Sequence, residues 1–386
     1  MCVTIRKVES KKDMLTFVSF ANNLYKGHPY YVPAMISDEI ATLDSRKNAA
    51  FEFCECDLYL AYKDGRLAGR VAAIVNHKAN AAWNKKEVRF GWIDFINDVE
   101  VSEALINKVM EYGRQRGMDE IAGPLGFTDF DPEGMLVRGF DRLSTMVCRF
   151  HYPYYKEHMV RLGLSKVVDW LEYRIQIPDE LPERLSTMSE LVRQKYGLKY
   201  RKVTRRDVFK EGLGQKFFDL INETYAKLYG YSLLSQKQID QYVNTYLRII
   251  DLRMVSFIVD ENDRIVAAGV TMPSMSKALQ KCGGKMFPLG WWYMLKNMFI
   301  KKDDTLDLLL IGVRPEYQDK GVNALIFADL FPRLRALGFK AAETNANLED
   351  NRKVQSQWVW FEYEQHKRRR VYGKSLADPQ DCPSVS

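Results

Sequence analysis

The chain has 386 residues, of which 46% are hydrophobic and 28% are charged, and this balance excludes disorder, collagen and coiled coil as descriptions of the whole chain. The length corresponds to two domains. Residues 1–178 hold equal numbers of basic and acidic side chains, so the formal net charge of +7 lies in residues 179–386. This excess predicts a polyanionic ligand for the second half, either a nucleotide-bearing cofactor or nucleic acid.

The first residues of the chain, Met1 to Val8, already include charged side chains and no apolar run begins there, so we expect no signal peptide. No run of about 18 apolar residues occurs, which excludes a spanning helix. The six cysteines are scattered, Cys54-Glu-Cys56 has neither a zinc nor a redox spacing, and the five histidines show no metal spacing. We therefore expect a cytoplasmic protein that binds no metal and does not insert stably into a membrane; its oligomeric state stays open.

The same order of predicted helices and strands occurs twice along the chain, which indicates an internal duplication. A hairpin at 58–75 turns at Asp64-Gly65, and a second hairpin at 256–271 has the same pattern. An apolar strand follows each hairpin, then a helix that a glycine ends (Gly117 and Gly338), then a further strand, helix and strand. The predicted domains are therefore 1–177 and 178–376, joined near Pro178, with a flexible tail at 377–386. Pro332 falls inside the second of these helices, where we expect a kink or a new helix start.

Residues 275–303 form an insertion in the second copy and include the aromatic run 286–300. We favour a buried helix between the domains. A cap over a hydrophobic acyl or acceptor pocket and an amphipathic membrane contact stay open as alternatives.

The stretch with the clearest chemical meaning joins the strand that ends at Val313 to the helix that opens near Gly321. The tight turn Gln318-Asp-Lys-Gly321 can present its backbone amides, and those of the first helical turn, to phosphate oxygens. Glycine lets the backbone approach such an anion closely. The first copy has no glycine in the matching turn and carries three acidic residues (Asp98, Glu100 and Glu103), which repel phosphate. We predict one phosphate-bearing ligand per chain.

At these residues the sequence resembles the GCN5-related N-acetyltransferase (GNAT) superfamily, whose signature is V-x-P-x-x-[QR]-x-x-G-x-[GA]. Val313-x-Pro315 and Gln318-x-x-Gly321 match it in type and spacing, whereas Asn323 replaces the usual Gly or Ala. Asp350-Asn351 resembles the family's E-N pair, and Trp358 stands where the family has a proton-donating Tyr. The resemblance covers roughly 200–376 well and 1–177 by element order only.

The resemblance implies an α/β fold of two tandem GNAT-like (acyl-CoA N-acyltransferase) domains, each a mixed, mainly antiparallel twisted sheet flanked by helices, with a degenerate first copy. It implies acetyl-CoA or another acyl-CoA as co-substrate, with the pantetheine arm along the strand and the pyrophosphate on the turn. The implied cofactor-binding residues are Ile311, Gly312, Val313, Gln318, Asp319, Lys320, Gly321, Val322, Asn323, Ala324 and Asn351.

Acyl transfer to an amine needs a base and a stabilised oxyanion. Asp307, six residues before Val313, resembles in position the glutamate base of some members, and Glu343 on the next strand can face the same cleft. A solvated strand entrance is the alternative for both. Tyr231 and Asn345 are the predicted contacts of the acceptor, with surface-turn packing as the alternative for Tyr231.

The function predicted from the sequence is direct acyl transfer, with acetyl as the favoured group, from CoA to a small amine or amino-acid-like acceptor. One alternative is a Fem-like aminoacyltransferase, which pairs two such domains and uses charged tRNA. The other is a non-catalytic CoA-binding or interaction protein.

Overall fold

The computed structural model describes residues 2–300 and 303–376, so the predicted tail at 377–386 lies outside the described residues. The chain divides into two compact units. Unit 1 comprises the chain up to Trp170, residues 276–294 and the chain from Lys367 onward, and unit 2 comprises 171–275 and 295–366. The two units do not follow the expected contiguous domains 1–177 and 178–376, because both β7 (Ser165–Gln176) and β14 (Tyr363–Ser375) pass from one unit into the other.

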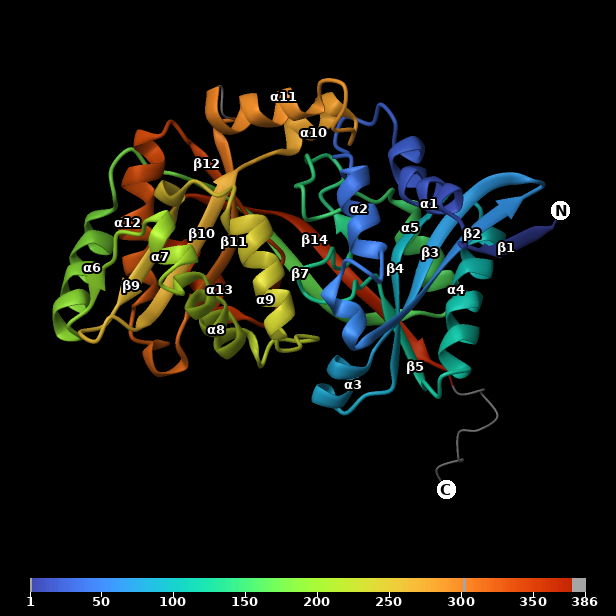
Figure 1. Ribbon diagram of the computed structural model, residues 1–386, viewed down its shortest axis with the longest axis horizontal. Coiled ribbons are helices and arrows are strands. Elements are labelled where there is room, and N and C mark those ends of the chain that lie inside the picture. The colour runs from blue at the N-terminus through green and yellow to red at the C-terminus, as the bar shows by residue number, and fades with distance from the viewer. Residues whose placement is uncertain (1, 301–302, 377–386) are drawn as a thin grey trace. The chain divides into compact units, whose positions relative to one another are not determined.

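Unit 1 has the strand order β1-β2-β3-β4-β5, with the end of β14 beside β5 (Figure 1). β4 and β5 are parallel and the other neighbours in this unit are antiparallel. Its elements are β1 (Val3–Lys7), α1 (Lys11–Leu24), α2 (Ile36–Leu43), η1 (Ala49–Glu52), β2 (Cys54–Lys63), β3 (Arg66–Asn76), α3 (His77–Trp83), β4 (Glu87–Phe95), α4 (Val99–Arg114), β5 (Glu120–Gly123), β6 (Met135–Arg138) and α5 (Tyr154–Arg161).

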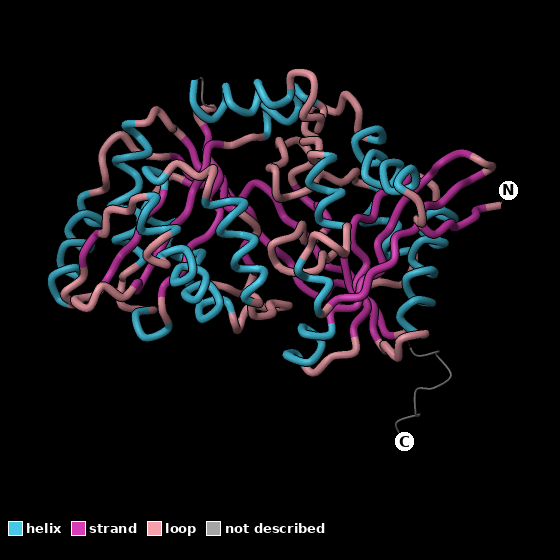
Figure 2. The backbone as a smooth tube through the Cα atoms, viewed as in Figure 1, coloured by secondary structure: helices cyan, strands magenta, loops and turns pink. Residues whose placement is uncertain are grey.

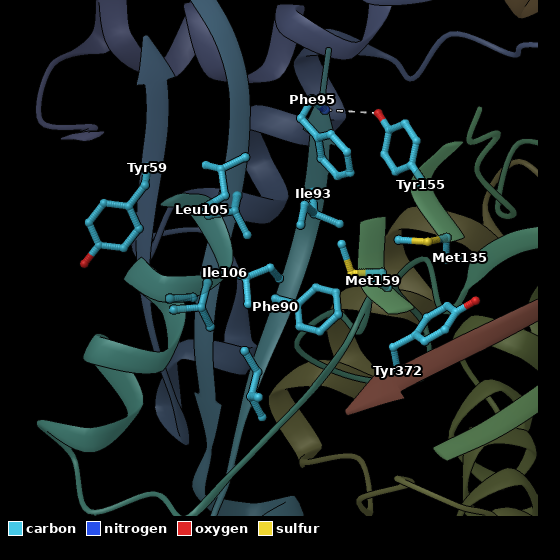
Figure 3. Close-up of a cluster of buried hydrophobic side chains, with 14 of the residues drawn as sticks. Tyr59, Phe90, Ile93, Phe95, Leu105, Ile106, Met135, Tyr155, Met159 and Tyr372 are labelled. Carbon is cyan, nitrogen blue, oxygen red and sulfur yellow. Dashed lines mark hydrogen bonds between the residues drawn. The ribbon is translucent and has the colours of Figure 1, made fainter. Parts of the chain in front are cut away.

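The core of unit 1 lies between α4, α5 and one face of this sheet (Figure 3). Leu105 and Ile106 of α4 are fully buried there, beside Phe90 and Phe95 of β4, because apolar residues recur at helical spacing along one face of α4. The Tyr155 hydroxyl accepts a hydrogen bond from the Phe95 amide at 3.1 Å, which satisfies a polar group inside this core.

Unit 2 repeats the order: the hairpin β9–β10 continues antiparallel into β11, and β12 is parallel to β11. The end of β7 pairs with β12, with Gln176 opposite Ala341. The elements are α6 (Glu183–Lys195), β8 (Lys199–Tyr200), α7 (Arg205–Phe209), α8 (Leu213–Tyr225), α9 (Gln236–Tyr242), η2 (Val243–Leu247), η3 (Leu252–Met254), β9 (Val255–Val259), β10 (Ile265–Pro273), β11 (Thr305–Val313), η5 (Pro315–Tyr317), α12 (Asn323–Ala336), β12 (Ala341–Thr344), β13 (Asn347–Leu348), α13 (Arg352–Gln355) and η6 (Ser356–Trp360).

The duplication in element order is confirmed, but the last strand of each copy pairs outside its own copy. The end of β7, from the first copy, pairs with β12, whereas the end of β14, from the second copy, pairs with β5. Element order along the chain does not contain this information, because strand partners are chosen by non-local contacts.

Helices cover both faces of the unit 2 sheet (Figures 1 and 2). Side chains of α6 and α12 pack with Leu306 and Ala342 in one buried cluster. α8 lies on the opposite face, where its Ile221 and Thr224 lie beside Gly312 of β11. α12 runs through Pro332 without the predicted restart.

The insertion forms α10 (Ser276–Cys282), α11 (Gly290–Leu295) and η4 (Lys296–Ile300). The expectation of a buried helix is wrong: Phe287 and Phe299 are 78% and 64% exposed, and both tryptophans, Trp291 and Trp292, are exposed. Among the described residues, none of the helices has the length and apolarity needed to cross a membrane.

Candidate functional site

β11 and β12 are paired at their beginnings and then separate. Their parallel register runs from Thr305 opposite Ala341 to Leu308 opposite Thr344, and β11 then continues to Val313. The pairing of β11 with β10 has an irregularity that passes over Leu309. The side-chain amide of Asn345 donates to the Leu309 carbonyl oxygen at 2.9 Å, in the position that a continuing strand would occupy. Beyond Leu309, β11 still pairs with β10 on one side, but its other edge has no neighbouring strand in the described part of the chain.

Side chains cover this edge of β11. The Tyr225 hydroxyl, from the end of α8, donates to the Ile311 carbonyl oxygen at 3.0 Å and lies 3.4 Å from the Ile311 nitrogen. The Gln318 side-chain amide donates to the Val313 carbonyl oxygen at 3.1 Å. A pantetheine arm that uses the main chain of Ile311 and Val313, as predicted, must therefore replace these two side chains.

The turn between β11 and α12 has the conformation that the motif predicts. Asp319 and Gly321 both have positive φ, at 61° and 76°, which folds the chain tightly before the helix. The amides of Tyr317 and Gln318 are used inside the turn, because both donate to the Arg314 carbonyl oxygen. Over the described residues, the amides of 319–323 donate no hydrogen bond, and Val322 at the N-cap of α12 supplies no capping side chain. Successive free amides at a helix start are what an anion binds.

Two cations border this turn. The Lys320 ammonium lies over the rings of Tyr196 and Tyr317, at 5.4 and 5.6 Å from their centroids. Lys353 pairs with Asp319 at 2.6 Å, and both of these side chains are exposed. Val322 and Ala324 point into the core and Asn323 is half-buried, so these three can meet a ligand only through their backbone or, for Asn323, part of its side chain.

In unit 1, the N-terminus of the matching helix, α4, is already capped by a side chain. Asp98 caps α4, and its carboxylate accepts from the Glu100 amide at 3.1 Å. Lys63 pairs with the same carboxylate. A carboxylate at this position satisfies the helix start and repels a second anion, which supports the expectation that only unit 2 binds phosphate.

The two predicted catalytic carboxylates lie side by side. Asp307 of β11 is directly opposite Glu343 of β12, and Glu343 is opposite Arg174 of β7. Cross-strand neighbours share one face of the sheet, so the three side chains form a row. This is the α8 face, since Leu306, next to Asp307 in sequence, points to the opposite core. Asp307 is 1% exposed.

Sequence reasoning missed two members of this row. Arg174 donates to Glu343 Oε1 at 3.1 Å and to the Thr305 hydroxyl at 3.3 Å. His366 of β14 places Nε2 3.8 Å from Glu343 Oε2 and is buried. Arg174 gave no signal beyond being a charge in an apolar strand, and His366 is one of the five histidines whose spacing pointed to no metal.

The remaining predicted residues have mixed placements. Tyr231 is buried, donates to Asn222 Oδ1 at 2.8 Å and lies edge-on to the ring of Tyr225 at 5.8 Å. Asn351 is the N-cap of α13 and accepts from the Val354 amide. Asn345 Oδ1 is buried and, over the described residues, has no hydrogen-bond partner, which leaves an acceptor for a ligand where β11 and β12 separate.

Trp358, at the position of the family's tyrosine, belongs to the core. Its ring is 2% exposed and packs against Phe327 at 5.6 Å and Tyr173 at 6.4 Å. This position therefore carries a packed indole and offers no hydroxyl.

Comparison with known proteins gave relatives along nearly the whole chain. No family model matches. The chain is 25% identical to protein YghO of Escherichia coli (strain K12), over 96% of this chain and 95% of that protein. It is 24% identical to the bacterial ceramide synthase of Caulobacter vibrioides, over 97% of this chain and 98% of that protein.

Among solved structures, the chain is similar to a tandem GNAT protein from the clavulanic acid biosynthesis pathway. The TM-score is 0.59 at 11% identity, with 98% of this chain and 99% of that chain covered. The fold is thus the tandem GNAT fold along the whole chain, as the motif and the duplicated element order predicted.

Proposed function

We propose that this chain, with its tandem GNAT fold, transfers an acyl group from acyl-CoA to an amine, with one acyl-CoA bound in unit 2. The observation that carries the proposal is the turn at 319–323, whose free amides lead into a helix that no side chain caps. We assign the pyrophosphate to these amides, with Lys320 adding charge at their border.

The acyl end of the substrate is assigned to the separation of β11 and β12. Asn345 holds this gap at Leu309, and its free Oδ1 is an acceptor for an amide of the pantetheine arm or for the incoming amine. The Tyr225 hydroxyl, which contacts the main chain of Ile311, is the group that the arm displaces or uses.

Asp307 and Glu343 are the proposed bases. The amine nitrogen attacks the thioester carbonyl carbon, the C–N bond forms and the C–S bond breaks, and the amine proton passes to one of these carboxylates while CoA leaves as its thiol. Arg174 holds Glu343 in place through its hydrogen bond and is a positioning residue. Trp358 stands at the position of the GNAT family's tyrosine, so the protonated carboxylate returns its proton to the leaving thiolate, directly or through solvent.

The acceptor has two candidates. A small amine with acetyl-CoA is the expectation from the sequence. A long-chain amine with a long-chain acyl-CoA is favoured by the relative named as a ceramide synthase, since a ceramide is the amide of a long-chain base and a fatty acid, and that similarity spans nearly all of both chains.

The test is CoA-thiol release over a matrix of acyl-CoAs, from acetyl to palmitoyl, and amines, from amino acids and polyamines to sphinganine, with products identified by mass spectrometry. Release that requires both partners supports the proposal. Tight acyl-CoA binding with no release for any amine supports a non-catalytic CoA-binding protein instead, and transfer only from charged tRNA supports the Fem-like alternative.

A further inference from the structure

Exposed apolar side chains gather in the segment 285–300, which we call the aromatic segment. Large apolar side chains that are at least one-third exposed concentrate in it: Met286, Phe287, Leu289, Trp291, Trp292, Leu295, Phe299 and Ile300. The segment is orange in Figure 1, in and beside α11. Exposed apolar side chains gathered in one short segment mark a place where a protein meets another apolar body.

The segment is held in place at its base. Gln280, in α10, donates to the carbonyl oxygens of Pro29 and Tyr31, both at 2.9 Å. The Gly284 carbonyl oxygen accepts from the Ile36 amide at 3.0 Å. A side chain on Gly284 would collide with the Ala34 carbonyl oxygen at 2.1 Å, so this anchor needs glycine. These hydrogen bonds fix the chain just before the segment, so a specific local structure holds its beginning in place.

Its charge has one sign. Between Ser274 and Ile300 the sequence contains lysines but no aspartate or glutamate. Lys277, Lys281, Lys285 and Lys296 are all exposed. Tryptophans beside phenylalanine and leucine, in a stretch of sequence whose charged side chains are all lysines, match the chemistry of a bilayer interface: apolar rings enter the headgroup region while ammonium groups meet anionic lipids.

We propose that the aromatic segment docks this protein onto the surface of an anionic lipid bilayer, with Phe287, Trp291 and Phe299 entering the interface. Charge selects this occupant over a second copy of the chain, because the lysines of the segment repel the same lysines of a second copy. The inference goes beyond the proposed acyl transfer and does not need it, although a membrane surface is where a long-chain amine would be met.

The experiment is flotation of the full chain with vesicles of phosphatidylcholine alone and of phosphatidylcholine mixed with phosphatidylglycerol, together with tryptophan emission. Binding to the anionic vesicles, with a blue shift and a loss of at least tenfold in affinity at high salt or in pure phosphatidylcholine, supports docking. The double variant Phe287→Ser/Phe299→Ser is expected to weaken binding at least tenfold, and Lys285→Glu/Lys296→Glu to remove the preference for anionic lipid.

The matched control is Val160→Ser/Val359→Ser, which removes two side chains that are 65% and 64% exposed but lie outside the segment. It is expected to bind vesicles as the unaltered chain does. Absence of binding to anionic vesicles, equal binding by Phe287→Ser/Phe299→Ser, or a dimer that this variant dissociates in place of vesicle binding would each overturn the proposal. Lipid binding is measured without turnover, so its failure leaves the acyltransferase proposal standing, and the reverse also holds.

Discussion

The variant Gly321→Ala tests whether the turn at 319–323 binds the phosphates of acyl-CoA, and a control glycine variant accounts for the effect of backbone strain. Gly321 has a φ of +76°, a region that costs an L-residue about 1–2 kcal/mol. An added Cβ would also lie 3.3 Å from Val192 Cγ2, so the turn must shift by a few tenths of an ångström. If the shift removes one amide–phosphate hydrogen bond, worth about 1.5–3 kcal/mol, acyl-CoA affinity falls roughly 10- to 100-fold.

Gly338→Ala is the matched control. Gly338 ends the same helix with a φ of +92°, but no atom lies within 4 Å of its added Cβ. Both variants are therefore expected to lower the melting temperature by a similar amount, about 2–8 °C. Isothermal titration with acetyl-CoA and palmitoyl-CoA should show the loss of affinity in Gly321→Ala alone. Unchanged binding by Gly321→Ala, or an equal loss in Gly338→Ala, would refute the assignment of the phosphate to this turn.

Three further changes test other parts of the molecule. Asp307→Asn should lower turnover by about 10²–10⁴ with acyl-CoA affinity retained, and the exposed Asp304→Asn serves as control; unchanged turnover removes Asp307 from the mechanism. Trp358→Ala should lower the free energy of unfolding by about 3–5 kcal/mol in urea titration, whereas truncation of the exposed Trp291 should change it little. Burial raises the pKa of Asp131 to about 6 from 3.8, so the folded state binds this proton more tightly than the unfolded state. That carboxyl therefore opposes folding above pH 3.8 and reaches its full cost above pH 6, so its cost shrinks by about 1 kcal/mol between pH 7 and pH 5. Asp131→Asn should remove this part of the pH dependence, and an identical pH profile in the variant would contradict it.

Local chemistry made the turn and the carboxylate pair predictable from the sequence. Gly321 and Gln318 specify a turn by their backbone preferences and spacing, and Asp307 and Glu343 meet because consecutive strands joined by a helix are parallel neighbours. The same reasoning applies to Asp98, whose side chain caps α4 as an acid at a helix start is expected to do.

Non-local contacts account for what the sequence did not reveal. Arg174 reaches Glu343 only because β7 leaves its own copy, and His366 lies near Glu343 because the start of β14 belongs to unit 2. No local pattern encodes either contact. The Tyr225 hydroxyl on Ile311 depends on how α8 packs. The aromatic segment was misjudged because apolar composition is the same for a helix that is buried in a protein and for one that binds a membrane surface.

The most direct measurement of the central claim is an equilibrium titration of the full chain with a non-hydrolysable acyl-CoA analogue, monitored by calorimetry. The free turn at 319–323 and the closed helix start at Asp98 predict one molecule bound per chain, with affinity lost in Gly321→Ala and unaffected by Gly338→Ala. Two equivalent sites, or no binding by the unaltered chain, would contradict the account.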